Sequence, residues 1–235
     1  SVGLLFIFIV GMILLTTMAL LPPFLQTLMG YPVMDVGLLL APRGVGTMMA
    51  MLVVGRMSGR VNARLLVLAG LLMTSASLYW MTRFTTDVTS WTVVQTGILQ
   101  GMGLGFLFVP LTALAFSTMP VAFRNDGTSL YSLVRNMGSS IGISAVISYL
   151  GSRTQINHAI LSEHIHSGSW ALQQGIEQGL HSIITPEGLS QLDAQVARQA
   201  AILAFAQDFQ AMMWLTLAAI PLLALLRTPS PAEKH

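Results

Sequence analysis

Apolar residues in this chain gather in long runs that are separated by polar stretches. A helix needs about 20 mostly apolar residues to cross the hydrocarbon core of a bilayer. Six runs meet this requirement, and we predict membrane-spanning helices at residues 2–26, 36–57, 65–84, 91–119, 129–151 and 199–226. The pattern therefore predicts an all-α membrane protein that crosses the bilayer about six times.

The fifth predicted span, residues 129–151, is the least apolar of the six. It contains Arg135, Asn136 and several serines and glycines. The apolar run 141–150 and the need to connect the neighbouring spans favour a membrane crossing here. Because it is polar on one side, we expect this helix to face protein or a cavity and not lipid.

One connection is long and polar, residues 152–198, whereas the others are short. Apolar residues recur at helical spacing around 170–180 and 189–196, and Pro186-Glu187-Gly188 separates the two patches. This pattern predicts two amphipathic helices outside the membrane or lying on it. We divide the chain into predicted spans over residues 1–151, an external amphipathic loop 152–198, a last span 199–227 and a tail 228–235.

Basic residues set the predicted orientation, because cytoplasmic loops of membrane proteins carry an excess of Lys and Arg. They gather after the second and fourth spans and in the C-terminal tail: Arg56, Arg60, Arg64, Arg124, Arg227 and Lys234. We expect these parts, and both ends of the segment, to be cytoplasmic. The chain enters an apolar run directly at Ser1 without the features of a signal peptide, so we expect a fragment of a longer protein.

The composition supports a membrane protein and excludes several kinds of chemistry. Charged residues make up 9% of the chain and hydrophobic residues 54%, whereas roughly 25% of a soluble domain is charged. The net charge is +2 and the arginines are dispersed, which does not indicate a nucleic-acid partner. Cysteine is absent, so there is no disulfide and no thiol nucleophile.

Metal, cofactor and catalytic motifs are not found in the sequence. His158, His164 and His166 lie near Glu163, but their spacing does not bring three ligands to one side of a helix. Neither a phosphate-binding loop nor an HExxH motif occurs. We therefore expect no metal site, no cofactor and no enzymatic activity.

Acidic residues are also missing from the middle of every predicted span. Asp35, Asp87 and Asp208 are expected near span ends or in loops. A proton-coupled carrier usually needs a membrane-embedded carboxylate. This expectation argues against the chain acting as a proton antiporter on its own.

Small residues and methionines mark two of the predicted spans. Gly97, Gly101 and Gly105 recur every four residues on one helix face, which permits close helix packing. Pro110 in the same span frees a carbonyl and can kink the helix. Met48, Met49 and Met51 indicate either an adaptable surface for varied ligands or ordinary membrane filling.

Several motifs, taken in order, carry a resemblance to a known family. Gly55, Arg56, Arg60 and Arg64 are similar to the cytoplasmic loop G-x-x-x-D-x-x-G-R-K of major-facilitator proteins, although Gly59 replaces its Asp and Asn62 its inner Gly. Further matches are Leu21-Pro22-Pro23-Phe24-Leu25-Gln26, Ala41-Pro42-Arg43-Gly44, Gln100–Gly105 and Arg135–Gly142. The chain resembles the C-terminal half of a fourteen-helix major-facilitator multidrug exporter of the EmrB/QacA type.

This resemblance implies a six-helix bundle of two inverted three-helix repeats, whose first, second, fourth and fifth helices line a central cavity. The implied cavity residues are Gln26, Arg43, Gln95, Gln100, Tyr131, Arg135 and Asn136. The implied packing residues are Gly97, Gly101, Gly105, Gly138 and Gly142. The missing N-terminal half would carry the proton-binding acid, and the cytoplasmic signature loop would be weakened as a switch by the loss of its Asp.

By the same resemblance, the whole protein exports hydrophobic drugs in exchange for protons in the inner membrane of a bacterium, as antibiotic-resistance transporters do. The long external region is similar to that of members that work with a periplasmic adaptor protein and an outer-membrane channel. The alternative is a non-transporting membrane scaffold or adaptor-docking module. The sequence contains no paired acid and no nucleophile–base set, so it does not support a membrane-embedded enzyme.

Overall fold

Long helices make up almost all of the described chain. The computed structural model describes residues 2–58, 60–85, 88–117, 124–163 and 186–225. The long helices are α1 (Val2–Pro23), α2 (Val33–Met57), α3 (Ala63–Met81), α4 (Ser90–Ser117), α5 (Arg124–Glu163) and α7 (Pro186–Ala218). A π-helical turn, η1 (Phe24–Leu28), continues α1, and a 3-10 helix, η3 (Pro221–Leu225), follows α7. The predicted all-α fold is confirmed.

Within the described residues, five helical segments are long and apolar enough to cross a membrane. They are Leu4–Leu28, Val33–Met57, Ala63–Met81, Ser90–Leu114 and Gly188–Leu223. Helix α5 covers the predicted fifth span and is not among them, because its charged and small polar residues lower the hydropathy. The chain is a multi-pass membrane protein whose least apolar helix, α5, packs against α1 and α7.

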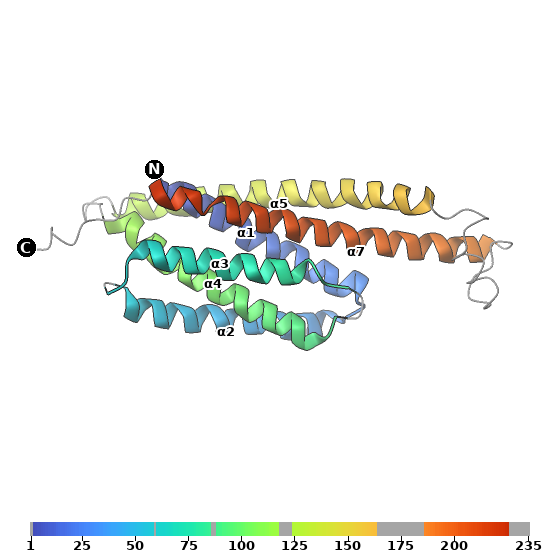
Figure 1. Cartoon of the computed structure of the whole chain (residues 1–235), viewed down its shortest axis with the longest axis horizontal. Helices are drawn as coiled ribbons and strands as arrows, with labels where there is room; N and C mark the ends of the chain where they lie inside the picture. Colours follow the sequence, from blue (N-terminus) through green and yellow to red (C-terminus); the bar gives the residue numbers. More distant parts are fainter. Residues whose placement is uncertain (1, 59, 86–87, 118–123, 164–185, 226–235) are drawn as a thin grey trace, which may run out of the picture.

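The helices lie side by side in a bundle (Figure 1). Helix α4 packs against α2 and α3, α1 packs against α5, and α7 packs against α3 and α5. In two three-helix repeats, α1 corresponds to α4 and α2 corresponds to α5. The contact between α1 and α5 then corresponds to the contact between α4 and α2. This pairing is the one expected of two inverted three-helix repeats.

An aromatic cluster connects α7 to η1 and to the residues after α3. The ring centroids of Phe24 and Phe205 are 5.4 Å apart, and those of Phe84 and Phe209 are 6.4 Å apart. Phe24 also lies 5.9 Å from Phe84. These rings belong to an apolar cluster that includes Leu20 and other buried side chains of α1, α3 and α7. Tilted and edge-on ring pairs of this kind stabilise a core beyond their buried area.

Two helices extend farther than the apolar pattern predicts. α5 continues to Glu163 and α7 begins at Pro186, so both enter the region predicted as the loop 152–198. Both project beyond the other helices of the bundle (Figure 1). Hydropathy locates only the apolar part of a helix, whereas backbone hydrogen bonds continue it into water. The predicted patch around residues 170–180 lies outside the described residues.

Side-chain contacts hold the two extensions together. Asn157 Nδ2 donates a hydrogen bond to the carbonyl of Ala200 at 3.3 Å. His158 Nε2 lies 3.0 Å from Asp193 Oδ1. The extensions therefore form a helical hairpin that is continuous with the membrane bundle.

Candidate functional site

A buried arginine lies at the contact between α2 and α4. Arg43 follows Pro42 inside α2 and is 6% exposed. Its Nη2 donates to the carbonyl of Leu14 in α1 at 3.5 Å, and its own carbonyl accepts from Thr47 Oγ1 at 3.0 Å. An arginine within a membrane helix is costly unless protein or water solvates it. Arg43 is thus solvated in part by the backbone of α1.

A second polar contact joins α4 to α1 in the interior. Gln100 Nε2 donates to Thr17 Oγ1 at 3.2 Å, and Thr17 Oγ1 donates to the carbonyl of Ile13 at 2.6 Å. Both side chains are fully buried. Gln100 Oε1 and Thr16 Oγ1 have no hydrogen-bond partner among the described residues. Buried polar atoms normally have a partner or an ordered water, so this junction has unused hydrogen-bonding capacity.

Close helix approach brings these two polar contacts together. A Cβ atom on Gly101 would overlap the carbonyl oxygen of Arg43, and one on Gly105 would lie 2.5 Å from Ala50 Cβ. Gly97 faces the same helix with more room, at 3.8 Å from Arg43 Cβ. α4 can therefore lie directly on α2 because these positions lack side chains. We call the group of Arg43, Thr17 and Gln100 the polar junction.

The α1–α5 contact depends on small residues in the same way. A Cβ on Gly138 would overlap the carbonyl of Phe8, and one on Gly142 would lie 2.7 Å from Thr16 Oγ1. Ser139 Oγ donates to the carbonyl of Gly11 at 3.0 Å. Four of the five glycines expected to pack the helices, Gly101, Gly105, Gly138 and Gly142, thus lie in close contacts of the two repeat-related pairs, whereas Gly97 has more room.

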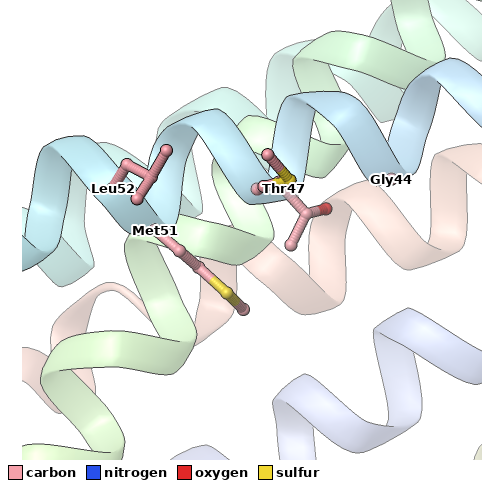
Figure 2. A pocket seen from close by; sticks show the side chains of 5 residues that line it. Gly44, Thr47, Met51 and Leu52 are labelled. Carbon is pink, nitrogen blue, oxygen red and sulfur yellow. The ribbon is translucent and has the colours of Figure 1, made fainter.

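An open apolar face runs along α2 beside the polar junction. Its exposed side chains include Met48 at 64% and Met51 at 39% exposure. A depression of about 480 Å³ lies on this face, lined by Gly44, Thr47, Met48, Met51 and Leu52. Thr47 and Met51 extend from the helix into this open space (Figure 2). Such a surface combines adaptable apolar area with one hydroxyl group.

The other sequence-predicted cavity residues lie apart from the polar junction. Gln26 is half-buried in η1 and Gln95 is exposed on α4. Tyr131 is half-buried in α5, with its hydroxyl 3.5 Å from Thr112 Oγ1. Farther along α5, Arg135 is half-buried and Asn136 is exposed. Of the seven predicted residues, the structure brings Arg43 and Gln100 together at one place.

The predicted signature loop connects α2 to α3. Gly55 and Arg56 lie in the last turn of α2, where Arg56 Nη1 donates to the carbonyl of Leu52 at 3.4 Å. Asn62 caps α3 by accepting a hydrogen bond from the backbone N–H of Arg64 at 3.1 Å. Arg60 is exposed. Arg56 is a cation in the last turn of α2, which is an electrostatically favourable position. Gly59, which replaces the Asp of the family pattern, lies outside the described residues.

The expectation that no acidic residue lies within a span is wrong for Asp208. This residue lies inside α7, within the membrane-spanning segment Gly188–Leu223, and is fully buried. Because α7 begins at Pro186, Asp208 is not near the end of the helix. Asp35 does lie at a helix end, in the first turn of α2, and Asp87 lies outside the described residues. The sequence offered one signal of this, because Asp208 interrupts an apolar run.

Sequence comparisons identify relatives of the chain. Residues 2–153 match the Major Facilitator Superfamily. The chain is 31% identical to the fatty acid resistance protein FarB of Neisseria gonorrhoeae over 75% of its length and 38% of that protein. It is 27% identical to the multidrug export protein EmrB of Haemophilus influenzae over 92% of its length and 42% of that protein.

A further relative is the probable multidrug resistance protein EmrY of Escherichia coli, which is 27% identical over 78% of the chain and 38% of that protein. The chain therefore spans well under two thirds of the length of these relatives. The family match covers more than half of the chain and agrees with its helix order and packing. The chain belongs to the Major Facilitator Superfamily.

Proposed function

We propose that this chain is the C-terminal half of a secondary transporter that exports hydrophobic compounds across the cytoplasmic membrane of a bacterium in exchange for protons. The names of the relatives support export of drugs and fatty acids. The observation that carries the proposal is the open face of α2. In the most apolar stretch of α2, 22% of the residues are buried, whereas 50% are buried in the corresponding stretches of α1, α3 and α4.

The chemistry of this face suits an amphipathic substrate. Methionine side chains adapt to varied apolar shapes, and Thr47 offers a hydroxyl beside them. Gly44 leaves space next to both. Binding sites for small molecules are mostly apolar with a few polar groups. The face of α2 would provide one wall of the binding site, and the N-terminal half would provide the other.

The polar junction would hold the helices behind this wall. Arg43 and Gln100 connect α2 and α4 to α1 by hydrogen bonds. In a transporter that alternates between two states, each half moves as a body around a central site. The junction would keep α1, α2 and α4 together during this movement, while Arg135 and Asn136 would face the moving partner from α5.

The proposed transport is tested in inverted membrane vesicles that contain the full-length protein. We expect uptake of a lipophilic cation such as ethidium into these vesicles when a proton gradient is imposed. An uncoupler collapses the gradient and should stop the uptake. Uptake that continues unchanged after gradient collapse would rule out proton coupling, and vesicles without the protein provide the baseline.

We also infer an orientation in which both ends of this segment are cytoplasmic, which makes the α5–α7 hairpin external. Its surface would contact a periplasmic adaptor protein that leads to an outer-membrane channel. The hairpin supports this inference because it projects beyond the bundle and exposes Ile156 and Leu189, at 46% and 51%. A contiguous apolar patch on such a projection is typical of interaction sites.

Site-specific crosslinking tests the adaptor contact. The chain has no cysteine, so Ile156→Cys and Leu189→Cys introduce single reactive positions. We expect both variants to crosslink to the adaptor through a short bifunctional reagent. Trp91→Cys is the matched control, because Trp91 is 63% exposed at the start of α4 and away from the hairpin. Equal crosslinking from all three positions would argue against docking on the hairpin.

A further inference from the structure

The carboxyl group of Asp208 is buried in the apolar core of the bundle. Asp208 is fully buried, and neither of its carboxyl oxygens has a hydrogen-bond partner among the described residues. Its neighbours along α7 are Phe205, Phe209 and Met212. These three belong to the apolar cluster that also contains buried leucines of α1 and α3. Asp208 is therefore a titratable group in an apolar environment.

The protonated form of this carboxyl is the one that the environment can accommodate. An ionised carboxylate without a partner is strongly disfavoured in an apolar medium, whereas a neutral acid loses much less solvation. Acidic residues within membrane helices commonly mark proton or ion pathways. The surroundings of Asp208 therefore suit the neutral carboxyl better than the ionised one.

Few charged groups face α7 from the helices around it. α1 and η1 have no titratable side chain, and α3 has Arg64 in its first turn and Tyr79, whose hydroxyl accepts from Arg83 Nη2 at 2.6 Å on the exposed surface. On α5, the titratable groups near the Asp208 turn of α7 are Tyr149 and Arg153. The guanidinium of Arg153 lies 4.9 Å from the centre of the Tyr149 ring. α7 itself adds Asp193 and Arg198 toward its N-terminus.

The inner part of α5 and its extension contribute groups that lie elsewhere. Arg135 and Tyr131 belong to the part of α5 that packs on the first turns of α1. His158 pairs with Asp193 on the hairpin. Among the described residues, Arg153 is the cation that shares a cavity with the helix turn around Asp208.

That cavity is a groove of about 350 Å³ between α5 and α7. Its polar lining consists of Tyr149, Arg153, Gln207 and Gln210, and Ala211 and Trp214 complete it. Gln207 directly precedes Asp208, and its Oε1 is buried without a partner among the described residues. A roomy cavity with several polar groups can hold water. Water held in this groove would contact Gln207, the residue that directly precedes Asp208 in α7.

We propose that Asp208 is a proton-binding site of the C-terminal half, and that water in the groove between α5 and α7 exchanges the proton. In the exchange, hydronium in the groove gives its proton to the ionised carboxylate, which leaves the neutral acid and one water molecule. A small rotation or opening of α7 against α5 would expose the carboxyl to the groove, where the charge of Arg153 favours the ionised form. The coupling of this proton exchange to export rests on the proposed function.

Infrared difference spectroscopy on the full-length protein tests the site directly. We expect a carbonyl stretching band of a protonated carboxylic acid that decreases when the external pH is raised. Asp208→Asn should remove this band, and Asp208→Glu should keep it at a shifted frequency. Asp193→Asn is the control, because Asp193 is an exposed acid on the same helix with 71% of its side chain accessible. A spectrum in which Asp208→Asn removes no band would overturn the proposal.

The coupling is tested by transport with the same variants. Asn resembles the neutral acid in size and cannot release a proton. We therefore expect Asp208→Asn to lose gradient-driven uptake and to keep binding of ethidium, which also shows that the variant is folded. Gradient-driven uptake at the wild-type rate would overturn the proposal. If the wild-type protein moved no substrate, the proposed function would fail, and the infrared band would still decide whether Asp208 binds a proton.

Discussion

At the residue scale, the missing side chains of glycines determine how closely the helices approach. Gly101 is the clearest position, because a Cβ atom there would overlap the carbonyl of Arg43. The same close approach brings Arg43 near Gln100 and the hydroxyl of Thr17. The polar junction thus depends on a position that has no side chain of its own.

We predict that Gly101→Ala destabilises the protein by about 1–3 kcal/mol, because an added methyl group in a closely packed contact forces the backbone to shift. Gly151→Ala is the matched control, since nothing lies within 4 Å of its added Cβ. That exposed helical position should gain about 0.5–1 kcal/mol from the better helix former. Thermal unfolding in detergent compares the two variants. A Gly101→Ala variant as stable as the control would contradict the packing described here.

The individual residues were only partly predictable from the sequence. The four-residue spacing predicted the face of Gly97, Gly101 and Gly105, because helical periodicity alone places them together. The partner of Gln100 was not predictable, since Thr17 lies 83 residues away in the chain. The burial of Asp208 was not predictable, because a sequence pattern does not show which side of a helix packs against its neighbours.

At the element scale, the α5–α7 hairpin is a continuation of two membrane helices. Pro186 begins α7, a position where its missing N–H costs nothing because the first helical N–H groups lack partners in any helix. Arg198 Nη2 donates to the carbonyl of Leu28 at 2.5 Å and thereby connects α7 to η1. The apolar pattern predicted where these helices cross the membrane, but their ends are set by contacts between helices that are distant in sequence.

The hairpin contacts should differ in strength. We predict that Arg198→Met destabilises the protein by about 1.5 kcal/mol, because it removes a charged donor from a backbone carbonyl at the end of a helix. Asp193→Asn should cost about 0.5 kcal/mol or less, because the pair with His158 is exposed. Chemical denaturation of the purified protein measures both values. The reverse order would show that the ion pair, and not the η1 contact, stabilises the hairpin.

At the scale of the whole molecule, the described helices leave the apolar face of α2 without cover. α3 and α7 pack against each other and against α4 and α5, whereas α2 packs mainly on α4. Six apolar runs predicted six helices, and the family resemblance implied that they form two three-helix repeats. The packing order of the helices could not be derived from composition, because every span is apolar enough to face lipid or protein.

In the proposed function, the open face of α2 forms part of an export path. The most direct measurement is drug export by the full-length protein after a bulky, water-soluble thiol reagent modifies Met51→Cys. We expect the modification to block export and a transported compound to slow the labelling. Trp80→Cys is the control, because Trp80 is 49% exposed on α3; its modification should leave export intact. Unchanged export by the modified Met51→Cys protein would contradict the account.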